Sequence, residues 1–394
     1  MSPRRVAFLA GLLVAVALGR LLGGPGAMGL IGGAALVASV AWLPAPAVRV
    51  LAALTLSGAA FGALRPLSGA AAAGVAALGV AAAARRLPAS IARRVAYVPP
   101  SLVLLIYVTT LLMYLAPGSP FAGERVVEPE IEQALRRHYG IPEDPLSFFA
   151  IYLTRLVSRG SLGPSLVVQG RTVEDLLAPA LPVSLALGLL ALALAVTLGL
   201  TLGVRAGLRP GSLEDAATTG LALLGVSLPN FVIGAGLVLL FAMHLEWLPV
   251  AGFGEPRHLV LPVLTLALPH TAYIARLARA GTAEVAREDF VRTARAKGLP
   301  ERLVVGRHIL RAAVLPVVSF LGPAAAGILT GSFVVETLFH LPGMGAWFVK
   351  GAINRDYPLV LGTSLLYFGL VVLLNLLADL ALAWLDPRTA EPSP

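Results

Sequence analysis

Long apolar runs separated by short polar connections dominate the chain. A transmembrane helix needs about 20 predominantly apolar residues to cross roughly 30 Å of hydrocarbon. Ten runs approach or exceed that length; the first four are rich in Ala and Gly, and the last six are rich in Leu and Val. The pattern therefore predicts about ten transmembrane helices. They span residues 6–22, 28–43, 47–64, 69–84, 99–116, 181–204, 216–243, 259–278, 313–337 and 361–385.

The composition agrees with this pattern. Hydrophobic residues make up 57% of the chain and charged residues only 13%, whereas about a quarter of the residues of a soluble domain are charged. The mean hydropathy is +0.85. We therefore expect an all-α polytopic membrane protein. Cytoplasmic loops, in which Arg and Lys accumulate, account for the formal net charge of +9, and no basic face interleaved with aromatic residues indicates nucleic-acid binding.

The placement of arginine predicts the orientation of these helices. Arg4 and Arg5 precede the first run, and nine basic residues lie between positions 276 and 311. With ten spans and a cytoplasmic start, these clusters fall on the cytoplasmic side. We expect a multi-pass protein of the inner membrane, in contact with lipid, with both termini in the cytoplasm and the segment 117–180 outside. A signal peptide is the alternative interpretation of the first run.

A gap in acidic residues marks the N-terminal part of the chain. Residues 1–95 contain no Asp or Glu, and the first acidic residue is Glu124. The shift in composition near residues 90–95 predicts a domain boundary. We expect residues 1–90 to form an additional membrane module of about four helices, and residues 93–390 to form a complete six-span unit.

Several kinds of chemistry are excluded by what the sequence lacks. It contains no cysteine, so it has neither disulfides nor thiolate metal sites. Its only two lysines, Lys297 and Lys350, are each followed by glycine, so no Walker A sequence is present. The six histidines are scattered without metal-ligand spacing, and no nucleophile elbow occurs. We expect a protein that is not an enzyme and that itself binds no metal, ATP or other cofactor.

The segment 117–180 has the composition of a soluble region. Apolar residues recur about one helical turn apart in residues 131–139, a Gly-Ile-Pro break follows at 140–142, and a second helical pattern runs through residues 148–156. Two amphipathic helices are predicted. They form either a docking surface for an external partner or a cap over the bundle.

Polar residues inside the apolar runs need an explanation, because burying them in lipid is costly. Asp379 lies in the last run, one helical turn after Asn375, and Asn230 follows Pro229 in the seventh run. Such residues either line a polar pathway or hold neighbouring helices together. The second interpretation is favoured for Asp379, which lies near the end of its run.

A dense basic segment lies between the eighth and ninth apolar runs. The pattern predicts a helix over residues 283–297, with Val291 and Ala294 on one face and Arg292 and Arg295 on the other. Such a helix, lying outside the bilayer, either fits a groove on another protein or rests on anionic lipid.

The residues after this helix predict a tight reversal of the chain. Gly298 is suited to end the helix, because glycine adopts the left-handed conformation without steric cost. Pro300 suits the first turn of a following helix, which leads back into the membrane.

The stretch RTARAKG, residues 292–298, resembles the EAA loop of ABC-importer permeases, whose pattern begins EAA-x-x-x-G. Arg292 stands where that pattern has Glu, Thr293 and Ala294 occupy the two small positions, and Gly298 occupies the glycine position. The wider stretch EDFVRTARAKGLPERLVVGRHILRAAVLPVV resembles the dipeptide/oligopeptide/nickel branch of that family. Further similar stretches are LAPGSP (115–120), ALRRHYGIPEDPLSFFAIYLTRLVSRGSLGPSL (134–166), SLPNFVIG (227–234), VVETLFHLPGMGAWFVKGAINRDYPLVLG (334–362) and DPR (386–388).

The resemblance covers about residues 93–390 and leaves residues 1–90 outside the family pattern. It implies a type I importer-like permease unit formed by the last six spans, with a cytoplasmic coupling loop at residues 279–312. It also implies partners: a second homologous permease subunit, two cytoplasmic ATPase subunits that hold ATP and Mg²⁺, and an external solute-binding protein.

The resemblance and the placement of polar residues together suggest site residues. Contacts with the ATPases are expected from Asp289, Arg292, Thr293, Ala294, Arg295, Lys297 and Gly298. The translocation pathway is expected to include Ser227, Pro229, Asn230, Phe231 and Asp379. Dipeptides, longer peptides, nickel complexes and oligosaccharides remain open as substrates. The alternative functions are a membrane scaffold or assembly protein and a self-sufficient secondary carrier.

Overall fold

The computed structural model describes residues 89–121 and 128–385, so the four predicted helices between residues 6 and 84 lie outside the described residues. All regular elements in the described part are helices, accompanied by one isolated bridge between Pro164 and Thr172. The described residues from Arg94 onward belong to one compact unit. The predicted all-α class is thereby confirmed for this part of the chain.

Five helices of this unit are long and apolar enough to cross a membrane. They confirm the predicted spans near residues 99–116, 181–204, 259–278, 313–337 and 361–385. The five are α5 (Ala89–Leu115), α8 (Val173–Leu208), α11 (Arg257–Val285), α15 (Leu315–Leu338) and α17 (Tyr357–Leu385).

The predicted continuous span at residues 216–243 is wrong. The structure has α9 (Leu213–Ser227), α10 (Asn230–Leu237) and a π-helical segment, η1 (Val238–His244), with a break at residues 228–229. Pro229 adopts an extended conformation, with φ −62° and ψ 146°. Proline has no N–H for the helix ladder, its ring clashes with the preceding turn, and it restricts the residue before it.

A stripe of glycines brings α8 and α11 into close contact. Gly199, Gly203 and Gly207 recur every four residues and therefore share one face of α8. A Cβ atom at Gly199 would lie 2.7 Å from Cγ2 of Ile274, and one at Gly207 would lie 2.7 Å from Cβ of Thr282. Small residues of this kind let membrane helices approach closely, because their association depends on van der Waals contact.

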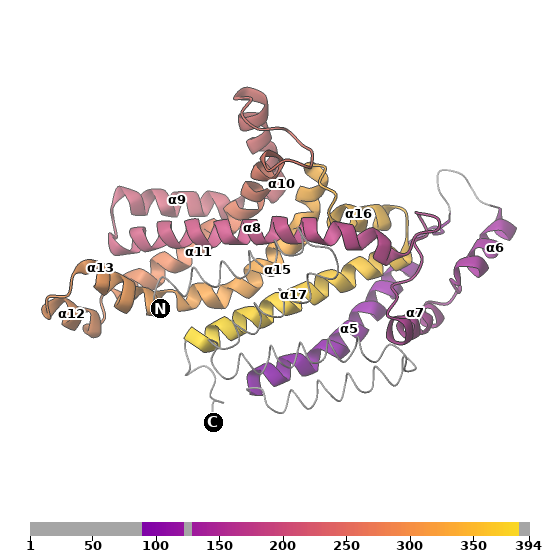
Figure 1. Cartoon of the computed structure of the whole chain (residues 1–394), viewed down its shortest axis with the longest axis horizontal. Coiled ribbons are helices and arrows are strands. Elements are labelled where there is room, and N and C mark those ends of the chain that lie inside the picture. The colour runs from indigo at the N-terminus through magenta and orange to yellow at the C-terminus, as the bar shows by residue number, and fades with distance from the viewer. Residues whose placement is uncertain (1–88, 122–127, 386–394) are drawn as a thin grey trace, which may run out of the picture. The chain divides into compact units, whose positions relative to one another are not determined.

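Shorter helices lie at the two ends of this unit (Figure 1). One end, called here the α12 end, carries α12 (Asp289–Ala296) and α13 (Glu301–Leu303). The connection back to α15 continues through η2 (Val304–Ile309) and α14 (Leu310–Ala313). The opposite end, called the α7 end, carries α6 (Pro129–Tyr139), α7 (Pro145–Arg159) and α16 (Met344–Ile353).

Candidate functional site

The basic segment at the α12 end forms a separate short helix. The predicted helix over residues 283–297 is wrong at its start, because α11 continues to Val285 and α12 begins only at Asp289. Glu288 between them is extended, with φ −65° and ψ 148°. This break turns α12 away from the axis of α11, so that its apolar face is buried within the chain.

The end of α12 has the predicted left-handed glycine. Gly298 has φ +74°, and its N–H donates to the carbonyl of Arg295 at 2.9 Å, while the N–H of Leu299 donates to the carbonyl of Ala294 at 3.4 Å. These two bonds form a Schellman motif. The chain therefore stops and reverses in a defined geometry. Pro300 lies at the N-cap of α13, one position before the helical turn in which it was expected.

The apolar face of α12 is buried against the chain's own return helix. Val291 is 0% and Ala294 is 4% exposed, and both pack with Val304, Ile309 and Ala313. The predicted division of this helix into an apolar and a charged face is confirmed. Ala294 thus faces the interior, where its small side chain allows α12 to lie close to η2 and α14.

The opposite side of α12 is exposed and densely polar. Arg292 forms an ion pair with Asp289 at 3.4 Å, and both side chains are strongly exposed. Thr293 and Lys297 are also exposed, and the Thr293 hydroxyl donates to the carbonyl of Asp289 at 2.9 Å. Phe290, whose exposed fraction is 47%, adds an aromatic ring to this surface.

One further ion pair bridges the reversal after α12. Arg295 donates to Glu301 at 2.8 Å, and this hydrogen bond lowers the pKa of the Glu301 carboxyl. Leu299 and Leu303 are exposed beside it. We call the exposed side of α12 together with these turn residues the α12 surface.

A third ion pair, which the sequence did not reveal, lies where α9 and α11 meet. Both atoms of the Asp215 carboxylate accept hydrogen bonds from Arg279, one of them at 2.8 Å. The backbone N–H of Gly211 donates to the same carboxylate at 2.9 Å. The Arg279 guanidinium and this N–H lower the pKa of Asp215 to about 2. The sequence carried only a weak signal for this pair: Asp215 directly precedes the predicted span 216–243, and Arg279 directly follows the predicted span 259–278.

Four of the predicted pathway residues surround the break between α9 and α10. Pro229 is exposed and Asn230 is half-buried, and the Phe231 ring is 56% exposed. The Ser227 hydroxyl is used within α9, because it donates to the carbonyl of Leu223 at 2.7 Å. Ser227, Pro229 and Phe231 are therefore exposed on the surface of the unit, whereas the side-chain amide of Asn230 lies beside Gly331 of α15.

Asp379 lies on a different helix from the other predicted pathway residues. It is half-buried on α17, one turn after Asn375. The Asn375 side chain lies over Gly322 of α15, and its amide donates to the carbonyl of Val371 at 2.8 Å. α17 is thus in contact with α15 one helical turn before Asp379.

The break between α9 and α10 lies level with the middle of α11. Just before the break, a Cβ atom at Gly225 would lie 2.8 Å from Cβ of Ala272; just after it, one at Gly234 would lie 3.2 Å from Cγ2 of Thr265. In lipid, an irregular backbone at such depth occurs only where protein or a water-filled cavity covers it. Since Leu228 is 44% exposed in this chain, the break needs such a cover.

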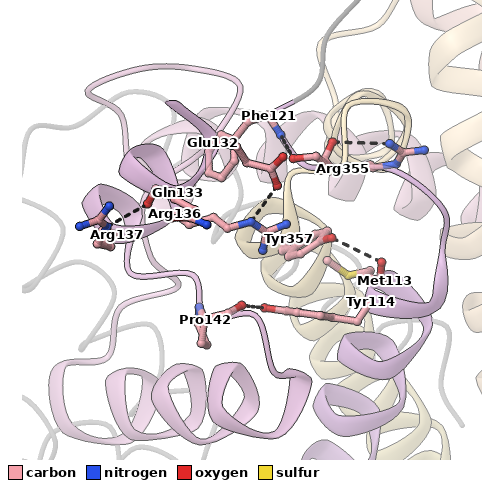
Figure 2. A network of polar contacts seen from close by, with 11 residues as sticks. Met113, Tyr114, Phe121, Glu132, Gln133, Arg136, Arg137, Pro142, Arg355 and Tyr357 are labelled. Carbon is pink, nitrogen blue, oxygen red and sulfur yellow. Dashed lines mark hydrogen bonds and ion pairs between the residues drawn. The ribbon is translucent and has the colours of Figure 1, made fainter. Parts of the chain in front are cut away.

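The two predicted helices of the external segment are confirmed as α6 and α7. Figure 2 shows the polar contacts at this end of the unit, where the loop between α6 and α7 is joined to α5, and the Tyr357 hydroxyl at the start of α17 donates to the carbonyl of Met113 on α5 at 3.5 Å. The Tyr114 hydroxyl donates to the carbonyl of Pro142 at 2.7 Å, and Arg136 donates to Glu132 at 2.8 Å.

An open groove of about 480 Å³ lies on α6 and α7. Its lining residues are Gln133, Arg136, Arg137, Gly140, Ile141, Pro142, Glu143 and Ile151. We call this the α6–α7 groove.

Comparison with known proteins identifies the family. A family profile described as "Binding-protein-dependent transport system inner membrane component" matches residues 171–391. The oligopeptide transport system permease protein OppB of Haemophilus influenzae is 43% identical over 300 residues, which cover 76% of this chain and 98% of that protein. The chain belongs to this family.

Two further relatives of this permease family extend the similarity. OppB of Escherichia coli K12 is 43% identical over 76% of this chain and 98% of its own length. The dipeptide transport system permease protein DppB of Bacillus subtilis is 41% identical over 71% of this chain and 91% of its own length. A crystal structure of an amino acid ABC transporter is similar at a TM-score of 0.42 and 19% identity, over 53% of this chain and 94% of that one.

Membership of the permease family fits the helices of the described part. The matched residues 171–391 include both the α12 surface and the break at residues 228–229. The family and the five apolar helices together make the chain a multi-pass inner-membrane transport component.

Proposed function

We propose that this chain is the transmembrane permease subunit of an ATP-driven importer of peptides. The relatives OppB and DppB are permease proteins of oligopeptide and dipeptide transport systems. The observation that carries the proposal is the construction of α12. Its apolar face is buried in the chain and its polar face is exposed at the end of the bundle. A helix that transmits movement from another protein needs both: one face fixed to its own chain and one face available to the partner.

The α12 surface would receive movement from ATPase subunits. Asp289, Arg292, Thr293 and Lys297 are exposed and free to contact a groove on an ATPase. Arg295 would contact the ATPase together with Glu301, its ion-pair partner. Ala294 and Gly298 would serve indirectly, since one packs the helix and the other ends it.

Movement of α12 would reach two spans at once. α12 follows α11 in the chain, and it packs on η2, which leads through α14 into α15. A rigid displacement of α12 therefore tilts α11 and α15 together. ATP binding shifts the permease between inward-open and outward-open states only through a difference in affinity for those states.

The remaining parts of the assembly follow from this proposal. The α12 end would face the cytoplasm, with both chain termini, two ATPases carrying ATP and Mg²⁺, and no ATP site on this chain. The α6–α7 groove at the opposite end would receive an external solute-binding protein. Residues 1–90 would add about four further helices, giving about ten spans when the broken segment α9–α10–η1 is counted with the five apolar helices.

A second, homologous permease subunit would complete the translocation pathway. It would cover the broken helix at residues 228–229, leaving Ser227, Pro229, Asn230 and Phe231 along a water-filled passage. Asp379 would face this passage at its cytoplasmic end or hold α17 in place. The cover is required because exposed irregular backbone is not stable in lipid.

Reconstitution of the complete complex tests the function. Proteoliposomes with external binding protein and labelled oligopeptide should accumulate peptide when ATP is enclosed, and accumulation should stop when ATP is removed or its hydrolysis is blocked. Uptake that continues without ATP would identify a secondary carrier. A complex that hydrolyses ATP but moves no peptide, cation complex or oligosaccharide would favour a scaffold.

A further inference from the structure

Among the described residues, two polar side chains near the middle of the bundle have end atoms without a hydrogen-bond partner. Asn230 begins α10, and His270 lies near the middle of α11, roughly 20 Å from either end at 1.5 Å per residue. Within residues 89–121 and 128–385, neither the Asn230 amide nor Nε2 of His270 makes a hydrogen bond. Both residues are half-buried. Such groups are costly at membrane depth unless water or a ligand reaches them.

Two glycines of α15 provide the space for these side chains. Gly327 and Gly331 are one helical turn apart, so they lie about 6 Å from each other on one face. A Cβ atom at Gly327 would lie 2.9 Å from Nε2 of His270, and one at Gly331 would lie 2.9 Å from the Asn230 amide nitrogen. Any other residue at either position would displace the polar group beside it. α15 thus holds the two groups side by side.

The surroundings of the His270 ring determine which of its nitrogens can accept. Nδ1 lies 3.0 Å from the carbonyl oxygen of Leu266, and a carbonyl oxygen can only accept. In the neutral ring, Nδ1 therefore carries the proton and Nε2 is a hydrogen-bond acceptor. The Asn230 amide offers one acceptor oxygen and an NH₂ donor. Together the pair presents acceptors and donors in the alternation found along a peptide backbone.

We propose that Asn230 and His270 form a mid-membrane site that binds the backbone of the peptide during passage. Nε2 of His270 accepts a hydrogen bond from a peptide N–H, and the Asn230 amide bonds the adjacent carbonyl or N–H. Contacts to the backbone suit a pathway for peptides of different sequence, since every peptide presents the same groups. This inference rests on the proposed function in peptide import.

The test compares two peptides of one sequence, one of them methylated on its amide nitrogens, in ATP-driven uptake by the reconstituted complex. A methylated nitrogen cannot donate to His270. The variants are His270→Phe, which keeps a ring but has no acceptor, and Asn230→Leu, which keeps the side-chain shape. His244→Leu is the matched control at an exposed histidine at the end of η1. The same binding protein delivers both peptides to every variant, so a change in their ratio reports on this chain.

The wild type and His244→Leu should prefer the unmethylated peptide. In His270→Phe, KM for the unmethylated peptide should rise about three- to tenfold, the range that one lost hydrogen bond gives. The preference should shrink by the same factor. Asn230→Leu should raise KM similarly.

The outcomes separate this site from the importer function. If the wild type imports peptide and both variants keep its KM and its preference, the site is overturned and the importer function stands. If the wild type shows no ATP-dependent peptide uptake, the importer function itself fails. Should a variant not assemble, Gly327→Ala displaces the His270 ring from α15. Gly369→Ala is its control, because the added carbon there meets no atom of the described residues within 4 Å.

Discussion

Asp215 on α9 and Arg279 on α11, which are 64 positions apart in the sequence, form a bidentate ion pair. Arg279 lies six residues before the end of α11, which leads into α12. The N–H of Gly211 completes the surroundings of the carboxylate, and the carbonyl of Arg279 faces Gly207 of α8. Three helices are thus joined next to the surface that we assign to the ATPases.

Replacement of Asp215 should loosen this junction in a pH-dependent way. The pKa of Asp215 lies at about 2, below its ordinary value of 3.8. A depressed folded-state pKa means that the carboxylate stabilises the fold above about pH 4 and loses this effect as pH falls through 2. In the assembled complex, Asp215→Asn should therefore lower the apparent Tm at pH 7. The difference from wild type should shrink steadily below pH 4. A difference that is constant from pH 7 to pH 2.5 would contradict the ion-pair account.

Substitutions at Gly298 should separate the α12 turn from the rest of the fold. Gly298→Pro removes the N–H that donates to Arg295 and fixes φ near −65°, whereas the turn needs +74°. We expect assembly in the membrane without coupling of ATP hydrolysis to uptake. The Cβ atom of Gly298→Ala would meet no atom of the described part of the chain within 4 Å, so this variant should cost only about 1–2 kcal/mol of backbone strain and retain much of the uptake. Equal uptake by the Pro and Ala variants would show that the turn geometry is not needed.

The contact between α8 and α11 should tolerate no added carbon at Gly207. A Cβ atom there would lie 2.6 Å from the carbonyl oxygen of Arg279, and overpacking of this kind costs about 1–3 kcal/mol. Gly207→Ala should therefore lower the apparent Tm of the complex. Gly220→Ala, on the side of α9 where the residues that the structure describes place no atom within 4 Å of the new carbon, should leave the apparent Tm unchanged or slightly raised. The same loss in both variants would point to a general effect of glycine replacement.

Asp356 should be essential for the α7 end of the bundle. Its buried carboxylate accepts from the Ser165 hydroxyl at 2.6 Å and from the N–H groups of Leu166 and Val167 at 2.8 and 3.1 Å. It also caps α17 by accepting from the N–H of Leu359 at 3.1 Å.

Hydrogen bonds to a charged group contribute about 1.5–3 kcal/mol each, so Asp356→Ala should destabilise the complex by about 3 kcal/mol or more. Ser165→Ala removes one donor of four and should cost about half as much. Thermal unfolding of both variants checks this order; a reversed order would show that the carboxylate does not hold the loop.

The sequence predicted the features that depend on local patterns. Apolar runs located five spans, and the alternation of Val291 and Ala294 with Arg292 predicted the two faces of α12. The break at Pro229 was missed because apolar composition continues across it, although proline itself carried the signal. The start of α12 at Asp289 was also missed, since burial of its apolar face decides where α11 must end.

Contacts between distant parts of the chain had no such signal. Ser165 and Asp356 are 191 positions apart, and nothing in either neighbourhood indicates the other. Glu336 is likewise fully buried, and it accepts a hydrogen bond at 2.7 Å from the N–H of Gly345 at the start of α16. Such partners arise from tertiary packing, which one sequence does not specify by periodicity.

The most direct test of the account is cross-linking from α12 to an ATPase subunit. The chain has no cysteine, so a single introduced thiol can carry a short photoreactive probe. Thr293→Cys and Lys297→Cys, on the exposed side, should cross-link to the ATPase in the assembled complex. Ala294→Cys, whose position is buried beside them, and Glu143→Cys, in the α6–α7 groove, should not. Cross-linking from Glu143→Cys to the ATPase, or none from Thr293→Cys and Lys297→Cys, would contradict the assignment of α12 as the coupling surface.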